Sequence, residues 1–273
     1  MIFGTVSSIF NAAVDDELVT NNPCRAGSVR TPKKQTRKVV PWPVERVGLV
    51  HDALPERYLV ATIAAGLGLR QGEAFGLAVE DVDFLRGTVK VRRQVRLLST
   101  GGQAFRLPKG KRDREIPLPD SVCDEIAAHL AAYPAQAVTL PWETTEGNPV
   151  TVALVVTTPE GNALKRNDYN RRVWRPAVKE AAVEQSRDDG CQALRHFFAS
   201  VLLDAGESIK AVSDYLGQSD PGFTLRTYTH LMPNSTERTK RAVDDAVGRY
   251  IGATAKVLQM GVRAGQRDVI VTG

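Results

Sequence analysis

Residues 190–231 read GCQALRHFFASVLLDAGESIKAVSDYLGQSDPGFTLRTYTHL, a stretch that predicts two short helices and a third that carries an isolated tyrosine, Tyr228. Gly206 is expected to cap the first helix, Ser208 to begin the second and Gly217 to end it. The apolar residues of the first helix recur at helical spacing and predict its buried side: Leu194, Phe197, Phe198, Val201 and Leu202.

Two polar residues of the first helix, Arg195 and Gln192, lie one turn apart and outside that apolar stripe. We therefore expect both side chains to point away from the core, where the arginine is available to an anion. The run LRHFFASVLLDAG, followed by YLG-Gln218 and the tyrosine of TLRTYTH, resembles the C-terminal half of the tyrosine recombinase (phage integrase) family. The family pattern is H-x-x-R, then L-G-H/W, then the nucleophilic tyrosine. Arg195 and Tyr228 match it, whereas Gln192 and Gln218 stand at the two histidine positions.

A second segment, GLGLRQGEAFGL, contains Arg70 just after a helix predicted to be buried (Leu59, Val60, Ile63, Ala64 and Leu67). A lone arginine at such a bend is more often a surface residue. The segment also matches the first sequence box of the family. That resemblance implies that Arg70 contacts the scissile phosphate and that Glu73 supports the site.

Between residues 88 and 118 the apolar period changes to two, which predicts a small antiparallel sheet with a basic turn. The resemblance makes Lys109 in this turn the catalytic lysine that reaches the DNA minor groove. Lys111 is a competing candidate, and an ordinary exposed lysine is the alternative. Other basic residues of this region are expected to contact DNA: Arg92, Arg93, Lys111 and Arg112.

The composition limits the possible classes of protein. The chain has 273 residues, 42% of them hydrophobic, and a formal net charge of +5. This suits one large or two small domains that bind a polyanion. Its three cysteines, Cys24, Cys123 and Cys191, are too scattered for a disulfide scaffold, and no apolar run is as long as a membrane span. Because the N-terminus also lacks the basic start of a signal peptide, we expect a cytoplasmic, thiol-reduced protein without a membrane partner.

The fold class expected from the pattern and the resemblance is α+β, mostly α-helical, with the small antiparallel sheet of a tyrosine recombinase catalytic domain. Residues 1–30 are expected to hold the last helix of a mostly missing core-binding domain, with an apolar stripe that ends at Asn21-Asn22-Pro23. Residues 31–40 are expected to form a basic linker, 41–250 the catalytic domain and 251–273 a C-terminal tail. The basic run at 25–38 is either a solvated loop or, as we favour, a segment that follows the DNA backbone: Arg30, Lys33, Lys34, Arg37 and Lys38.

The resemblance implies a site-specific recombinase that cleaves and rejoins double-stranded DNA through a 3′-phosphotyrosyl intermediate, as a tetramer on DNA. No metal, ATP or other cofactor is expected, because two arginines can neutralise the phosphate and the phosphotyrosine conserves the bond energy. An amide at position 218 can still donate a hydrogen bond to phosphate, but Gln192 cannot titrate near neutral pH. His196 and His230 are interpreted as structural. Two alternatives stay open: a catalytically weakened DNA-binding relative and a helix-turn-helix transcription factor formed by residues 194–216.

Overall fold

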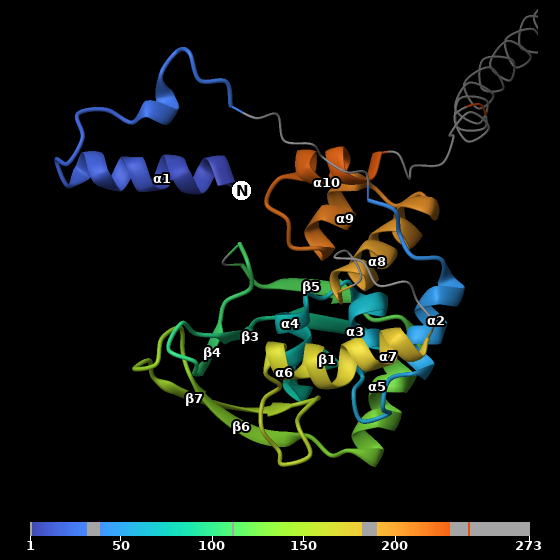
Figure 1. Ribbon diagram of the computed structural model, residues 1–273. Coiled ribbons are helices and arrows are strands. Elements are labelled where there is room, and N and C mark those ends of the chain that lie inside the picture. Colours follow the sequence, from blue (N-terminus) through green and yellow to red (C-terminus); the bar gives the residue numbers. More distant parts are fainter. Residues whose placement is uncertain (1, 32–38, 111, 182–189, 230–239, 241–273) are drawn as a thin grey trace, which may run out of the picture. The chain divides into compact units, whose positions relative to one another are not determined.

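The structure, a computed structural model, describes residues 2–31, 39–110, 112–181, 190–229 and 240. The chain divides into two units, residues 1–38 and residues 39–273. Helices and short strands alternate along the second unit (Figure 1). Its elements are α2 (Val44–Asp52), α3 (Val60–Leu67), α4 (Gln71–Phe75), β1 (Val82–Asp83), β2 (Thr88–Val91), β3 (Gln94–Leu97), β4 (Gln103–Arg106), β5 (Arg114–Pro117), α5 (Asp120–Ala132), β6 (Gln136–Pro141), β7 (Pro149–Leu154), α6 (Arg166–Tyr169), a π-helical turn (Asn170–Trp174), α7 (Arg175–Glu180), α8 (Gln192–Asp204), α9 (Ile209–Tyr215) and α10 (Pro221–Tyr228).

The first unit contains one long helix, α1 (Ile2–Asp15), and a 3-10 turn at Pro23–Arg25. The helix ends before the predicted stop at Asn21, because Glu17 adopts a left-handed φ of 56°. The chain then folds back, and the Asn22 amide donates to the Ser7 carbonyl at 2.9 Å and to Asn11 Oδ1 at 2.8 Å. None of the residues of α1 is buried.

The predicted antiparallel strands are present, but the prediction of a single sheet is wrong. Strand order β1-β2-β5 forms one sheet, while β3-β4 and β6-β7 form two separate hairpins. The backbone leaves the first sheet at Arg92–Arg93, where the Arg93 side chain turns inward to an acidic pair. The third hairpin was not expected. Only β7 alternates in burial, and the paired Val138 and Val152 are both buried.

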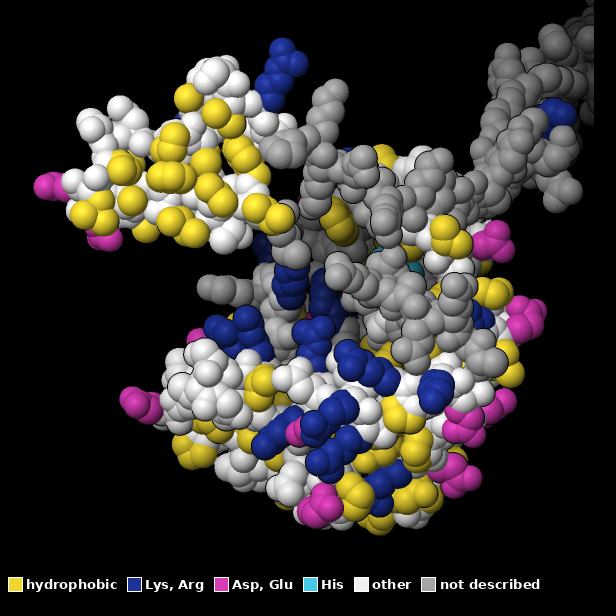
Figure 2. Space-filling model, in the orientation of Figure 1, with side chains coloured by type: hydrophobic (Ala, Val, Ile, Leu, Met, Phe, Trp, Pro, Cys, Tyr) yellow, Lys and Arg dark blue, Asp and Glu magenta, His cyan; other side chains and the backbone are white. Residues whose placement is uncertain are grey.

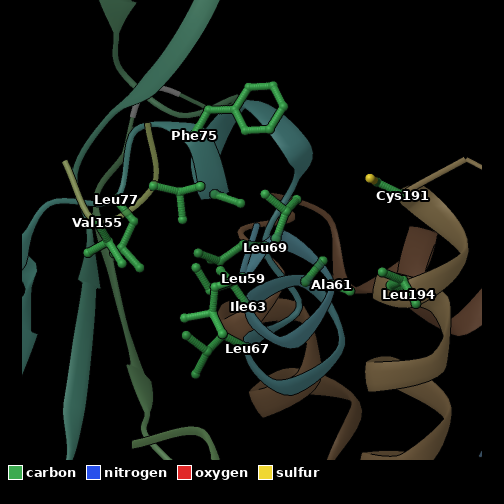
Figure 3. Packing of buried hydrophobic residues seen from close by; sticks show 14 of the residues in the cluster. Leu59, Ala61, Ile63, Leu67, Leu69, Phe75, Leu77, Val155, Cys191 and Leu194 are labelled. Carbon is green, nitrogen blue, oxygen red and sulfur yellow. The ribbon is translucent and has the colours of Figure 1, made fainter. Parts of the chain in front are cut away.

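The hydrophobic core of the second unit is built around α3, whose residues Val60, Ile63, Ala64 and Leu67 are buried as predicted. Figure 3 shows Ile63 and Leu67 on the side of Leu77 and Val155, whereas Ala61 faces Leu194 of α8. Gly68 ends α3 with a φ of 62°, and a Cβ at this position would lie 2.4 Å from the Phe198 ring. The glycine thus permits both the left-handed turn and the close approach of α8.

The three C-terminal helices form as predicted. Gly206 has a φ of 86° after α8, the Ser208 hydroxyl accepts from the Ala211 N–H at 3.1 Å at the start of α9, and Gly217 has a φ of 57° after it. Val201 does not belong to the buried stripe, since it is 48% exposed. The α-helices α8, α9 and α10 lie together, on the side of the second unit opposite the β6–β7 hairpin (Figure 1). Among the helices of the described residues, none combines the length and the apolar character that crossing a membrane requires.

Candidate active site

The bend between α3 and α4 positions Arg70 and Glu73. The Glu73 carboxylate accepts from the backbone N–H of Arg70 at 2.9 Å, which fixes the start of α4, and from Arg70 Nη1 at 3.0 Å. The Glu73 side chain is fully buried, but that of Arg70 is 22% exposed. The guanidinium of Arg70 is therefore anchored at one end and accessible at the other.

Arg114, which the sequence analysis did not select, completes this arrangement from β5. Its Nη1 and Nη2 atoms donate to the two Glu73 oxygens at 3.2 and 2.7 Å, and its Nε donates to the Tyr215 carbonyl at 2.7 Å. Burial acts to raise the pKa of Glu73, but the hydrogen bond and charge of Arg114, with the charges of Arg70 and Arg195, outweigh it and hold the pKa below its usual value. Glu73 is thus a buried carboxylate shared by two arginines.

Arg195 does not point away from the core as predicted, because its side chain is buried, with 1% exposure. Its Nη1 donates to the Gly68 carbonyl at 2.5 Å and its Nη2 to the Leu216 carbonyl. These carbonyls lie at the C-terminal ends of α3 and α9, where helix carbonyls lack partners and carry partial negative charge. Burial, with the charge of Arg70, lowers the pKa of Arg195 to about 9. The guanidinium has five N–H groups, so these two bonds leave further donors for an anion.

Tyr228, the last residue of α10, lies beside the two arginines and is fully buried. Burial raises the pKa of its hydroxyl to about 12, although the nearby charges of Arg195 and Arg70 act in the opposite direction. Nδ1 of His196 lies 2.6 Å from this hydroxyl. His196 was interpreted as structural, and the structure adds this contact: one residue beyond Arg195, the helix turns its side chain toward α10. His230 lies outside the described residues.

The two glutamines occupy different environments. Gln192 is exposed at the first position of α8. Gln218 is half-buried, and its Oε1 accepts from the Thr224 hydroxyl, which leaves the amide nitrogen as the donor. Thr224 thereby orients the side-chain amide that the sequence analysis expected to donate to phosphate.

Lys109 lies in the exposed turn between β4 and β5, and Lys111 lies outside the described residues. The next residue, Gly110, approaches the end of α9, since a Cβ built on it would lie 3.9 Å from the Gly217 carbonyl oxygen. The turn that carries Lys109 is therefore close to the segment that holds Arg195 and Arg114.

The predicted DNA-contact residues separate into two groups. Arg30 in the first unit, and Arg92 and Arg112 in the second, are exposed. Arg93 is buried and donates to Asp81 at 2.7 Å and to Glu80 at 2.6 Å, so its predicted contact with DNA is wrong. Its burial is stabilised because the two carboxylates compensate its charge. The other predicted contacts lie outside the described residues: Lys33, Lys34, Arg37 and Lys38.

A further basic surface, which was not predicted from the sequence, lies on α6, the π-helical turn and α7. We call this the α6–α7 surface, and it consists of six exposed residues: Lys165, Arg166, Arg171, Arg172, Arg175 and Lys179. Figure 2 shows Lys and Arg side chains gathered on the face where α6 and α7 lie in Figure 1. The density of basic residues in the run KRNDYNRRVWRPAVK was the signal available in the sequence. In the described part of the chain, His, Cys, Asp and Glu side chains form no group of three that could hold a metal ion.

Arg70, Arg195 and Tyr228 lie near one another on an α+β fold with small antiparallel sheets, an arrangement that can bind an anion next to a hydroxyl group. The chain belongs to the phage integrase family, whose model matches residues 50–235. The family assignment and the mostly helical fold expected from the sequence are therefore confirmed.

Individual relatives agree with this assignment. The chain is 26% identical over 255 residues to a tyrosine recombinase XerC-like protein of Caldanaerobacter subterraneus, an alignment that covers 88% of this chain and 64% of the relative. It is 23% identical to the integrase of Mycobacterium phage L5, over 93% of this chain and 62% of the relative. The chain thus spans less than two thirds of the length of these relatives. The fold is shared with the integrase of the transposon Tn1549, solved in complex with transposon right end DNA, at a TM-score of 0.67 and 20% identity over 90% of this chain and 78% of that one.

Proposed function

We propose that this chain carries the catalytic centre of a site-specific DNA recombinase, which cleaves and rejoins double-stranded DNA through a 3′-phosphotyrosyl intermediate. The observation that carries the proposal is the convergence of Arg70, Arg195 and Tyr228, from α4, α8 and α10, on one site. Arg70 and Arg195 are 125 positions apart in the sequence. They come close together because α3, which precedes Arg70, packs against α8.

The arginines supply electrostatic stabilisation to a phosphodiester. Each guanidinium can donate to the non-bridging oxygens, on which negative charge increases in the transition state. Glu73 and the helix-end carbonyls hold Arg70 and Arg195 in place before DNA arrives. Little energy is then needed to orient them during the reaction.

The tyrosine supplies the nucleophile. The Tyr228 oxygen attacks phosphorus, the bond to the 5′-oxygen breaks, and Lys109 gives that oxygen a proton. The phosphotyrosyl bond conserves the energy of the original linkage, so the strand is rejoined without ATP. Because Tyr228 is buried, attack requires the segments that cover it to open so that the phosphate reaches the hydroxyl.

Double-stranded DNA is the proposed substrate, and basic surfaces are its proposed contacts. The α6–α7 surface and the exposed Arg92 and Arg112 can replace condensed counterions along the phosphate backbone. A tetramer on DNA remains part of the proposal, because exchange of strands between two duplexes requires four cleavages. Residues 1–30 are proposed to contribute the last helix of a core-binding domain, and residues 31–40 the basic linker that follows it.

The two alternatives are weaker. Gln218 keeps an oriented donor, and the Tyr228 hydroxyl has a histidine beside it, so Gln192 alone does not remove proton handling from the site. The helix-turn-helix alternative is not favoured, since its second helix, α9 (sequence IKAVSDY), offers few side chains for base edges.

The test is covalent capture from a pool of nicked duplexes with randomised sequence, because the target site is unknown. A nick beside the scissile phosphate lets the short product diffuse away and traps the protein on DNA. We expect an adduct that survives SDS and retains a 5′-end label, since a 3′-phosphotyrosyl bond keeps the 5′ fragment. An adduct that retains only a 3′-end label contradicts the proposed linkage, and binding without any adduct contradicts the proposed activity.

A further inference from the structure

We propose that His196 accepts the proton of the Tyr228 hydroxyl during cleavage, in place of the histidine that the family pattern has at position 192. The inference rests on the proposed function and adds a named base to it. In the structure the His196 Nδ1 atom lies 2.6 Å from the Tyr228 hydroxyl oxygen, within the range of a strong O–H···N hydrogen bond.

The geometry suits proton transfer. When the ring carries its proton on Nε2, Nδ1 accepts the O–H of Tyr228 directly. The two ring centroids are 5.7 Å apart and the planes are inclined by 58°, so the residues meet at their polar edges and do not stack. His196 is adjacent to Arg195 in α8, and one helix therefore positions both a phosphate-binding group and the base.

Other side chains near the site are poorly suited to this role. Gln192 is an amide and does not accept a proton near neutral pH. Glu73 already accepts four hydrogen bonds from Arg70 and Arg114. Arg70 and Arg195 are the cations that face the tyrosine. Of the helices packed against α8, α3 contains no titratable residue, and α9 carries the exposed Lys210 and Asp214 and the half-buried Tyr215. Besides Tyr228, α10 carries the exposed Arg226.

A base is needed because burial disfavours ionisation of the Tyr228 hydroxyl. Its burial raises the pKa to about 12, so at neutral pH the oxygen retains its proton until an acceptor takes it. A histidine, with an ordinary pKa near neutrality, is suited to accept the proton and to return it.

The proton of the Tyr228 hydroxyl moves to His196 Nδ1 while the phenolate oxygen forms a bond to phosphorus. The bond between phosphorus and the 5′-oxygen breaks, and that oxygen receives a proton from Lys109. During rejoining the directions reverse: the 5′-hydroxyl attacks, and the His196 imidazolium returns its proton to the departing Tyr228 oxygen.

The test compares His196→Asn with wild type in the rate of covalent adduct formation on a nicked duplex at saturating protein. The pH range is about 5.5 to 9, from about one unit below to about 2.5 units above an ordinary histidine pKa. Asparagine places an acceptor oxygen near the position of Nδ1 but cannot take the proton. We expect the rate to fall by about 100-fold or more. In the wild type the rate should rise with pH and level off as an imidazole loses its proton, and the variant should lack this dependence. The matched control is His51→Asn, which replaces an exposed histidine of α2 and should behave as wild type.

A second variant, His196→Ala, distinguishes the loss of a base from a folding defect. The His196→Ala rate should increase when imidazole is added and should follow the concentration of its neutral form. A merely structural histidine does not give this response. If wild type forms the adduct but His196→Asn retains its rate and pH profile, or if imidazole leaves His196→Ala unchanged, the inference is overturned while the proposed function stands. Absence of any adduct with wild type counts against the proposed function itself.

Discussion

Both carboxylate oxygens of Glu73 accept hydrogen bonds from the guanidinium of Arg114, a residue 41 positions further along the chain. The same carboxylate holds Arg70, and the Arg114 Nε reaches the Tyr215 carbonyl at the end of α9. Glu73 and Arg114 therefore link the Arg70 segment, strand β5 and the end of α9. Arg114 acts on the site through Glu73 and the end of α9, as a positioning residue.

Arg114→Lys should destabilise the second unit, because a lysine cannot make both bonds to Glu73 and the bond to Tyr215 at once. Because lysine keeps the charge, we expect a loss in the free energy of unfolding below the about 3–5 kcal/mol that removal of one partner of a buried ion pair costs. Urea unfolding followed by circular dichroism measures it. Arg86→Lys is the matched control, since Arg86 is 81% exposed and its pairing with Asp83 contributes little. Equal stability of the two variants would contradict the positioning role.

Stability should also depend on acid pH through Glu73. Its pKa in the folded protein lies below the usual value of 4.5, so the carboxylate contributes stability above about pH 4.5, and this is lost as pH falls through the folded pKa. Glu73→Gln removes the titrating group. The difference in unfolding free energy between wild type and this variant should therefore be constant from pH 7 to about 5 and shrink at lower pH. A difference independent of pH down to about 3 would show that folding does not lower the pKa of Glu73.

Gly68→Ala should disturb the packing of α8 against the end of α3, which supports the site. A Cβ at this position meets the Phe198 ring at 2.4 Å and the φ of 62° is unfavourable for alanine, so we expect a loss of about 1–3 kcal/mol in unfolding free energy. Gly48→Ala in α2 is the control, because a Cβ there meets nothing within 4 Å and alanine favours helix. Thermal unfolding of both variants measures the effect, and a neutral Gly68→Ala would contradict the packing described here.

The sequence predicted the helical elements well, since the buried stripe of α3 and the caps of α8 and α9 are local signals. Arg195 was misplaced because helical periodicity classifies an arginine as surface-facing. The carbonyls that hold it belong to Gly68 and Leu216, on elements that only the tertiary fold brings near.

Two further side chains have partners that the sequence did not reveal. Arg93 looked like one more residue of a basic run, and only the position of Asp81 and Glu80 in the fold shows that its charge is compensated. His196 was judged from its place on α8 alone, and the direction in which α10 approaches that helix could not be read from the sequence. In each case a charged or titratable side chain was assigned without knowledge of its partner.

DNA binding should be strongly salt-dependent and should involve the α6–α7 surface. Each phosphate contact contributes about −0.9 to the slope of log affinity against log salt concentration. The triple variant Arg171→Gln, Arg172→Gln, Arg175→Gln should reduce the magnitude of this slope by about 2–3 units. Arg86→Gln, which removes one exposed charge near β1, serves as the control and should change the slope by about one unit at most. A triple variant with the wild-type slope would exclude this surface from the DNA interface.

Tyr228 is proposed to form the covalent bond to DNA. Capture on a nicked duplex recovered from the randomised pool tests this role most directly. The wild type should yield an SDS-resistant adduct that retains the 5′-end label, and Tyr215→Phe, a change to a neighbouring tyrosine of α9, should yield it as well. Tyr228→Phe should still bind the duplex but form no adduct, because it lacks the attacking oxygen. An adduct formed by Tyr228→Phe at the wild-type level would contradict the role of Tyr228 as the nucleophile.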